Sequence, residues 1–187
     1  MIEVEMRSFL TDGTYHTLLR QFRVDGHDVC PVRQITYYLD SGVDTRVQIS
    51  RNSGKLWQKL GKMHDAMRTE FEVALSRKDA KELLQIMENL GFAVKVVWYR
   101  ERVEFNIGQL TVSLDHTIGY GRILEVEILC EESEANGSRD LLSKFLTEIG
   151  IAQSSKEEFD TAYRRYLLEW RSRTAGLSES WLDEEAP

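Results

Sequence analysis

The sequence predicts an α+β fold in which about eight antiparallel strands form a closed or nearly closed barrel, a tunnel with helices packed outside it. The first supporting observation is that charged and apolar residues alternate along nearly every predicted strand. Successive side chains of a strand point to opposite sides, so each strand has one charged and one apolar face. The second observation is that acids and arginines gather on different strands instead of mixing at random.

The strands are expected where alternating runs, rich in β-branched and aromatic residues, are bounded by turn residues. The strongest turn signal is Asn52-Ser53-Gly54, and Asn106-Ile107-Gly108 is a second one. The strands are expected at residues 2–9, 33–39, 44–50, 55–60, 67–75, 92–105, 109–115 and 120–130.

Helices are expected where capping residues precede apolar residues at helical spacing. Thr11 or Asp12 caps the first helix, Ser76 the second, and Ser138 begins the third. Gly91 ends the second helix, as glycine commonly does. The helices are expected to run from residue 11 or 12 to about 22, and over 77–90, 138–150 and 155–173.

The chain has 187 residues and a formal net charge of −7. We expect a single tunnel domain over residues 1–174 and an acidic, disordered tail at 175–187. The negative charge argues against general nucleic-acid binding, and no apolar run approaches the roughly 20 residues that span a bilayer. No signal peptide is visible, so we expect a cytoplasmic protein in which Cys30 and Cys130 are free thiols; a disulfide between them stays open.

Alternation alone fits two architectures. An open antiparallel sheet would have helices on one face and water on the other, whereas a barrel would have a charged lumen. The separation of the charges favours the barrel. The acidic pairs are Glu3 with Glu5, Glu70 with Glu72 and Glu125 with Glu127, and the arginine pair is Arg100 with Arg102.

A lumen with an acidic and a basic side suits a particular ligand chemistry. A triphosphate carries about four negative charges near neutral pH, and arginine can grip two phosphate oxygens with its planar fork. Mg²⁺ and Mn²⁺ prefer oxygen ligands, which carboxylates supply. A metal that bridges phosphate oxygens neutralises developing charge and orients an in-line attack. Such a lumen is therefore suited to a metal-dependent site for a triphosphate.

These motifs, in this order, resemble the CYTH superfamily of triphosphate tunnel metalloenzymes, which includes class IV adenylyl cyclases, thiamine triphosphatases and inorganic triphosphatases. The hallmark Glu-x-Glu-x-Lys strand corresponds to Glu3-Val4-Glu5-Met6-Arg7, with Arg in place of Lys. Gln48 stands where many members have a second Arg, so the basic side of the tunnel has one cation fewer. The resemblance covers residue 1 to about residue 170. Its further matching positions are Arg46, Lys59, Glu70, Glu72, Arg100, Arg102, Asp115, Gly119 or Gly121, Glu125 and Glu127.

The resemblance implies Mg²⁺ or Mn²⁺ as the cofactor and a small-molecule triphosphate as the substrate of a monomer or homodimer, with no nucleic-acid or membrane partner. The implied metal ligands are Glu3, Glu5, Asp115, Glu125 and Glu127. The implied triphosphate ligands are Arg7, Arg46, Lys59, Arg100 and Arg102. The catalytic set joins these two groups, leaving out Arg46. Glu70 and Glu72 are either further tunnel acids or members of salt bridges in the lumen.

Three functions follow from this interpretation. The first is metal-dependent hydrolysis of a triphosphate, such as inorganic tripolyphosphate, a nucleoside triphosphate or thiamine triphosphate. The second is a class IV-type adenylyl cyclase that converts ATP to cyclic AMP and pyrophosphate. The third is polyphosphate binding without catalysis, which the complete set of acids disfavours. Hydrolysis is favoured because it requires fewer specific contacts.

Overall fold

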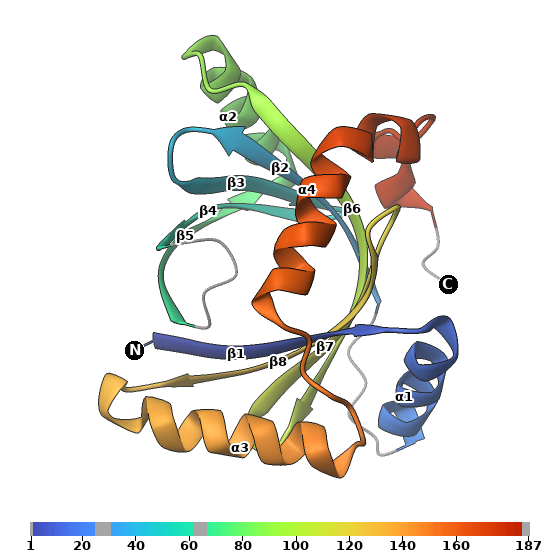
Figure 1. Cartoon of the computed structure of the whole chain (residues 1–187). Coiled ribbons are helices and arrows are strands. Elements are labelled where there is room, and N and C mark those ends of the chain that lie inside the picture. The colour runs from blue at the N-terminus through green and yellow to red at the C-terminus, as the bar shows by residue number, and fades with distance from the viewer. Residues whose placement is uncertain (1, 25–30, 62–66, 185–187) are drawn as a thin grey trace.

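The computed structural model describes residues 2–24, 31–61 and 67–184. Eight strands and four α-helices follow one another along the chain, with a 3₁₀ turn before α3 and another near the C-terminus (Figure 1). The strands are β1 (Ile2–Leu10), β2 (Val32–Asp40), β3 (Asp44–Ser50), β4 (Ser53–Leu60), β5 (Met67–Ser76), β6 (Val94–Ile107), β7 (Leu110–Thr117) and β8 (Gly121–Cys130). The helices are α1 (Asp12–Val24), α2 (Arg77–Asn89), α3 (Ala135–Glu148) and α4 (Lys156–Arg173), and the 3₁₀ turns are η1 (Glu132–Glu134) and η2 (Glu179–Asp183).

The strands form one antiparallel barrel in the order β1-β5-β4-β3-β2-β6-β7-β8. β1 pairs with β8 over its whole length, from Ile2 opposite Cys130 to Leu10 opposite Arg122. Its pairing with β5 is limited, in the described residues, to Glu3 with Arg68 and Val4 with Met67. The ring of strands therefore closes through one narrow seam, and the predicted α+β fold with a nearly closed barrel is confirmed.

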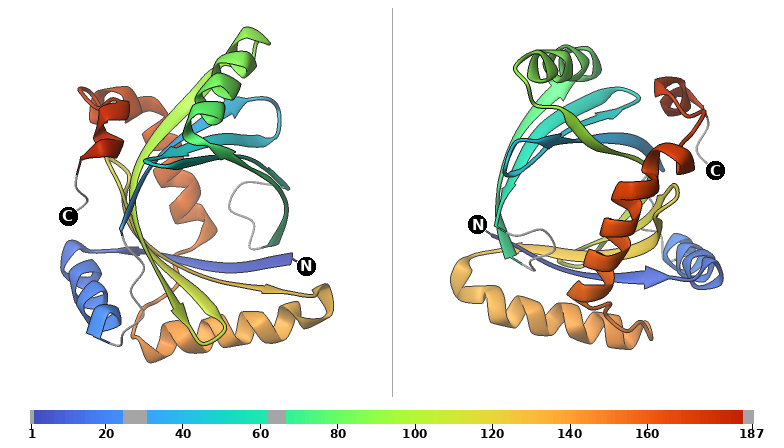
Figure 2. Two further views of the ribbon diagram at one scale, coloured as in Figure 1. Left: turned by 180° about the vertical axis from the view of Figure 1, so that it is seen from behind. Right: turned by 45° about the horizontal axis from the view of Figure 1, so that its top comes forward.

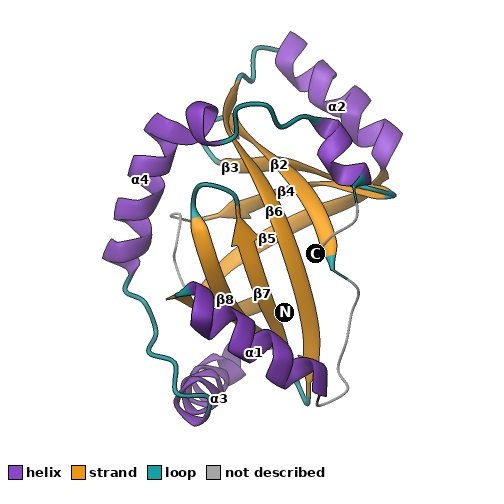
Figure 3. Cartoon of the chain, turned by 90° about the vertical axis from the view of Figure 1, so that its right-hand side faces the viewer, coloured by secondary structure: helices purple, strands orange, loops and turns teal. Residues whose placement is uncertain are grey.

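The apolar faces of the strands point outward, and the helices cover most of them, although Phe71 and Val73 on β5 stay exposed, at 59% and 55%. α1 and α3 pack against β1 and β8, and α2 lies at the opposite end of the barrel from α3 (Figure 3). α4 runs across the barrel (Figure 1). Its Tyr163 and Tyr166 are buried against Tyr38 and Trp98. No described helix is both long and apolar enough to span a membrane. The helices thus leave the polar faces of the strands to line the interior.

Helix starts follow their capping residues, with one correction. Ser76 caps α2 by accepting a hydrogen bond from the backbone N–H of Asp79, and Ser155 forms a capping box with Glu158 at α4. The predicted start of the third helix at Ser138 is wrong, because α3 begins at Ala135 and continues a 3₁₀ turn. The capping hydrogen bonds lie at the start of that turn, where Glu131 and Glu134 form a capping box and the Glu134 side chain accepts from the Glu131 backbone N–H at 3.2 Å.

The C-terminal segment corrects the expectation of a disordered tail, as far as residue 184. Residues 175–184 fold back over the barrel and end in η2 (Figure 2). Trp181 and Leu182 are buried, at 4% and 2% exposure, and the Arg33 guanidinium lies 4.8 Å from the Trp181 ring centroid. Arg77 binds Asp183 at 2.6 Å. The acidic composition suggested a solvated tail, but its two apolar residues complete a core that helices leave uncovered, and basic residues hold its carboxylates.

Replacing Trp181 with Ala tests this role. Removing a buried Trp side chain typically lowers the free energy of unfolding by about 3–5 kcal/mol, and the Arg33 stacking contact is lost as well. We expect a clearly lower melting temperature in thermal denaturation, and no such change for Ser180→Ala, which alters an exposed neighbour. An unchanged melting temperature for Trp181→Ala would show that the segment does not contribute to stability.

Candidate active site

The polar faces of the strands enclose a cavity of about 470 Å³. Seven of the eight strands contribute to its lining, β7 being the exception. Glu3, Arg102 and Glu125 all face it, so the predicted common charged face is present. Of the twelve residues predicted as site residues or additional tunnel acids, the structure places all except Asp115 on the cavity wall. These are Glu3, Glu5, Arg7, Arg46, Lys59, Glu70, Glu72, Arg100, Arg102, Glu125 and Glu127.

Strand register explains why acids from both ends of the domain meet. β1 and β8 are antiparallel neighbours, and Glu5 lies directly opposite Glu127 while Arg7 lies opposite Glu125. Directly paired side chains on one face of an antiparallel pair have Cβ atoms about 5 Å apart. The two Glu-x-Glu segments therefore form one acidic wall.

Three of these acids form a group that suits a divalent cation. Carboxylate oxygens of Glu3, Glu5 and Glu127 lie within 4.8 Å of one another. Mg²⁺ and Mn²⁺ take oxygen ligands and retain several waters, so three carboxylates on one wall of an open cavity fit such an ion. These residues are the candidates to hold a metal.

Burial and neighbouring carboxylates raise the pKa values of two members of this group. Burial raises the pKa of Glu3 to about 8, with Glu5 and Glu127 adding to the rise and Lys59 opposing it. Burial also raises the pKa of Glu127 to about 7, and the Glu125 charge contributes next. Without a cation, protons are therefore retained on this cluster near neutral pH.

Arg102 organises a second group of acids. Its guanidinium donates to both carboxylate oxygens of Asp115 at 2.8 Å and to Glu125 at 2.9 Å. Burial opposes ionisation of Glu125, but Arg102, followed by Arg7, outweighs it and lowers the pKa of Glu125 to about 2. Asp115 is 2% exposed and contacts Arg100 as well, at 3.4 Å. Asp115 and Glu125, both predicted as metal ligands, thus form ion pairs with arginines and lie outside the Glu3–Glu5–Glu127 cluster.

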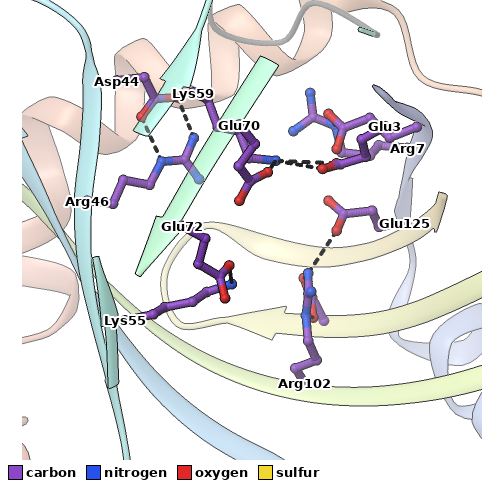
Figure 4. Close-up of polar contacts among 12 residues, drawn as sticks. Glu3, Arg7, Asp44, Arg46, Lys55, Lys59, Glu70, Glu72, Arg102 and Glu125 are labelled. Carbon is purple, nitrogen blue, oxygen red and sulfur yellow. Dashed lines mark hydrogen bonds and ion pairs between the residues drawn. The ribbon is translucent and has the colours of Figure 1, made fainter. Parts of the chain in front are cut away.

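The remaining basic residues also contact carboxylates (Figure 4). Lys59 lies 3.3 Å from Glu3 and 3.1 Å from Glu70. Lys55 lies 2.7 Å from Glu72, so both Glu70 and Glu72 take part in salt bridges of the lumen, the second of the two roles considered for them. Arg7 lies 3.5 Å from Glu5.

Arg46 is held by residues that sequence reasoning missed. Asp44 accepts hydrogen bonds from its Nε at 2.7 Å and its Nη2 at 2.6 Å. The rings of Tyr38 and Trp57 lie 4.4 and 5.4 Å from the guanidinium carbon. Asp44 and Arg46 share a strand face, which spacing could have indicated, but the ring of Tyr38 comes from the neighbouring strand and requires the β2–β3 register.

A nearly closed antiparallel barrel, with carboxylates and cations lining one cavity, defines a charged β-tunnel protein. The family model described as CYTH domain matches residues 1–163. The chain therefore belongs to the CYTH domain family. No curated protein matches it.

Solved structures share this fold. The PH1819 protein of Pyrococcus horikoshii OT3 is 24% identical with a TM-score of 0.72, covering 90% of this chain and 99% of that one. A putative adenylate cyclase from Vibrio parahaemolyticus is 17% identical with a TM-score of 0.67, covering 86% and 98%. HpAC1 from Hippeastrum, a putative adenylyl cyclase described as having a dominant triphosphatase activity, is 18% identical with a TM-score of 0.59, covering 98% and 99%. At these identities the similarity concerns the fold.

The raised pKa values of Glu3 and Glu127 predict a pH-dependent stability. Both exceed the ordinary value of 4.5, so between about pH 4.5 and 8 the folded state binds more protons than the unfolded state. Without divalent metal, we expect the melting temperature to fall as the pH rises through this window. Mn²⁺ should oppose the fall because it replaces the protons.

Thermal melts at several pH values, with chelator and with Mn²⁺, measure this effect. Calorimetry in buffers of different ionisation enthalpy should also detect proton release on Mn²⁺ binding. Glu127→Gln removes one of the two titrating groups and should flatten the pH dependence. A metal-free melting temperature that rises from pH 5 to pH 8 would contradict the assignment.

Proposed function

We propose that this protein is a metal-dependent triphosphatase that hydrolyses a triphosphate inside the barrel. The observation that carries the proposal is the cavity itself, where the Glu3–Glu5–Glu127 cluster shares one enclosed space with Arg100, Arg102 and Lys59. The candidate substrates are inorganic tripolyphosphate, a nucleoside triphosphate and thiamine triphosphate. The proposed cofactor is Mg²⁺ or Mn²⁺.

Charge explains why a metal belongs to this proposal. Among the described residues, six cations line the cavity, and nine carboxylates line it or contact those cations. A triphosphate with about four negative charges would meet an excess of acid in the protein alone. A divalent cation held by Glu3, Glu5 and Glu127 would supply the missing positive charge, polarise phosphate oxygens and activate water.

The chain's own residues would bind and orient the phosphates. Arg100 lines the cavity, and its only ion pair among the described residues is a loose one, at 3.4 Å, from Nη1 to Asp115, so its guanidinium keeps donor capacity for a phosphate oxygen. Lys59 lies between the acidic cluster and Glu70 and can contact a phosphate near the metal. Arg102 is committed to Asp115 and Glu125, so we assign it chiefly to holding the wall in place. Charges fixed in this way require little rearrangement as negative charge develops during the reaction.

The alternative is cyclisation of ATP to cyclic AMP and pyrophosphate. The name of the Vibrio parahaemolyticus protein as a putative adenylate cyclase supports it. The triphosphatase activity named for HpAC1, within the same fold, supports hydrolysis. We favour hydrolysis because attack by water needs no precise placement of a ribose hydroxyl.

The deciding experiment is incubation of the full chain with ATP and, separately, with tripolyphosphate, each with Mg²⁺ or Mn²⁺ and with a chelator as control. Orthophosphate as the product, dependent on metal, would support the proposal, and phosphorus NMR can identify it. Cyclic AMP with pyrophosphate would select the cyclase. Absence of turnover with every metal and substrate would favour binding without catalysis.

Arg100 provides a quantitative prediction for this function. A charge-assisted hydrogen bond contributes roughly 1.5–3 kcal/mol, so Arg100→Ala should lower kcat/KM by about ten- to a hundredfold. Arg100→Lys keeps the charge but loses the planar fork and should recover only part of the loss. Thermal melts check the fold, and Arg20→Ala, on the exposed side of α1, is the control substitution. Kinetics of Arg100→Ala equal to those of the wild type would remove Arg100 from the phosphate site.

A further inference from the structure

Two amide side chains interrupt the charged lining of the cavity. Gln34 on β2 and Gln48 on β3 both face it. They are diagonal neighbours, because Gln34 pairs with Ser50 and Gln48 pairs with Thr36. Neither amide makes a hydrogen bond to another residue in the described part of the chain, although each borders the open cavity.

Their surroundings separate these amides from the ionic groups. Each of the six cations of the cavity lies within 4 Å of a carboxylate. Gln34 lies opposite Arg100 on β6, and Gln48 lies opposite Lys55 on β4. Between the two amides, Thr36 is 1% exposed and its Oγ1 has no hydrogen-bond partner. The wall formed by β2 and β3 therefore carries uncommitted hydrogen-bonding groups next to the basic residues.

The chemistry of an amide does not match that of phosphate. An amide offers two N–H donors and one carbonyl acceptor but no net charge. A phosphate chain only accepts hydrogen bonds, so it would leave the carbonyl oxygens of the two glutamine amides without donors. A ligand with a ring that carries both donors and acceptors could bind the N–H groups and the carbonyl oxygen of each amide.

The cavity also has room for more than phosphates. Its volume of about 470 Å³ lies within the range of roughly 300–1,000 Å³ typical of sites for organic ligands. A substrate whose phosphates lie against Arg100 would have space for a further group along β2 and β3.

We propose that Gln34 and Gln48 form a subsite for the non-phosphate group of an organic triphosphate, a heterocyclic base with hydrogen-bond donors and acceptors. The two amides thereby select an organic triphosphate over inorganic tripolyphosphate. This inference rests on the proposed function, whose candidate substrates it narrows.

The test compares substrates within each variant. The measured quantity is the ratio of kcat/KM for ATP, GTP and UTP to kcat/KM for tripolyphosphate. Loss of hydrogen bonds that only the organic substrate makes should lower this ratio about tenfold for at least one nucleotide in Gln34→Ala or Gln48→Ala. Gln48→Arg adds a phosphate-binding cation and should shift the ratio further towards tripolyphosphate. Gln58→Ala is the matched control, because Gln58 lies on the opposite face of β4 and binds Thr45.

The results of these experiments distinguish failure of the proposed subsite from failure of the proposed triphosphatase function. A ratio unchanged for every nucleotide in both alanine variants would overturn the subsite while leaving the triphosphatase intact. If the wild type turns over no substrate, hydrolysis is rejected, and the subsite is tested by calorimetric titration of ATP into the protein in the presence of Mn²⁺. Weaker ATP binding by Gln48→Ala than by Gln58→Ala would then support the subsite. Equal binding, or no binding to the wild type, would overturn the subsite as well.

Discussion

The guanidinium of Arg102 is the contact on which the interior of this barrel depends. It joins three neighbouring strands, because Arg102 belongs to β6, Asp115 to β7 and Glu125 to β8. A carboxylate buried without a partner would be strongly unfavourable, and one planar fork satisfies two of them. The arginine also remains charged at any ordinary pH, so the arrangement does not depend on titration. By binding both of these acids, it holds them apart from the Glu3–Glu5–Glu127 cluster, which has no arginine of its own at such distances among the described residues.

The Glu3–Glu5–Glu127 cluster is costly for the fold and useful for binding a cation. Like charges held within 4.8 Å repel one another, and the raised pKa of Glu3 and Glu127 records that repulsion together with burial. Lys59 relieves part of it but is shared with Glu70. A site whose carboxylates are held close together before a cation arrives needs little reorganisation to bind it. The same residues whose charges oppose one another in the folded state are therefore the candidates to bind a metal.

The sequence pattern predicted which face of each strand is charged, but it did not predict which acidic and basic side chains form ion pairs with one another. Alternation placed Glu125 and Arg102 on one face, and the structure agrees. Asp115 was predicted as a metal ligand from the family resemblance, and residue order does not reveal which cation lies beside it. The pairing of β6 with β7 sets Asp115 opposite Arg102, which donates to it at 2.8 Å. The C-terminal segment was predicted to be disordered for a related reason, because composition does not reveal that Trp181 packs into a hydrophobic core.

Aromatic rings complete the account of how the cations are held. Arg7 lies over Phe159, Arg46 over Tyr38 and Arg100 over Trp98, with distances of 4.7, 4.4 and 5.3 Å to the ring centroids. A ring attracts a cation by roughly 0.5–2 kcal/mol without carrying a charge that would repel a phosphate. These rings continue into the cluster buried beneath α4, where the hydroxyl of Tyr166 donates to the carbonyl of Val97 at 3.0 Å. α4 therefore contacts residues of the cavity lining directly, through Phe159, Tyr163 and Tyr166, and its packing helps to fix the positions of the cations.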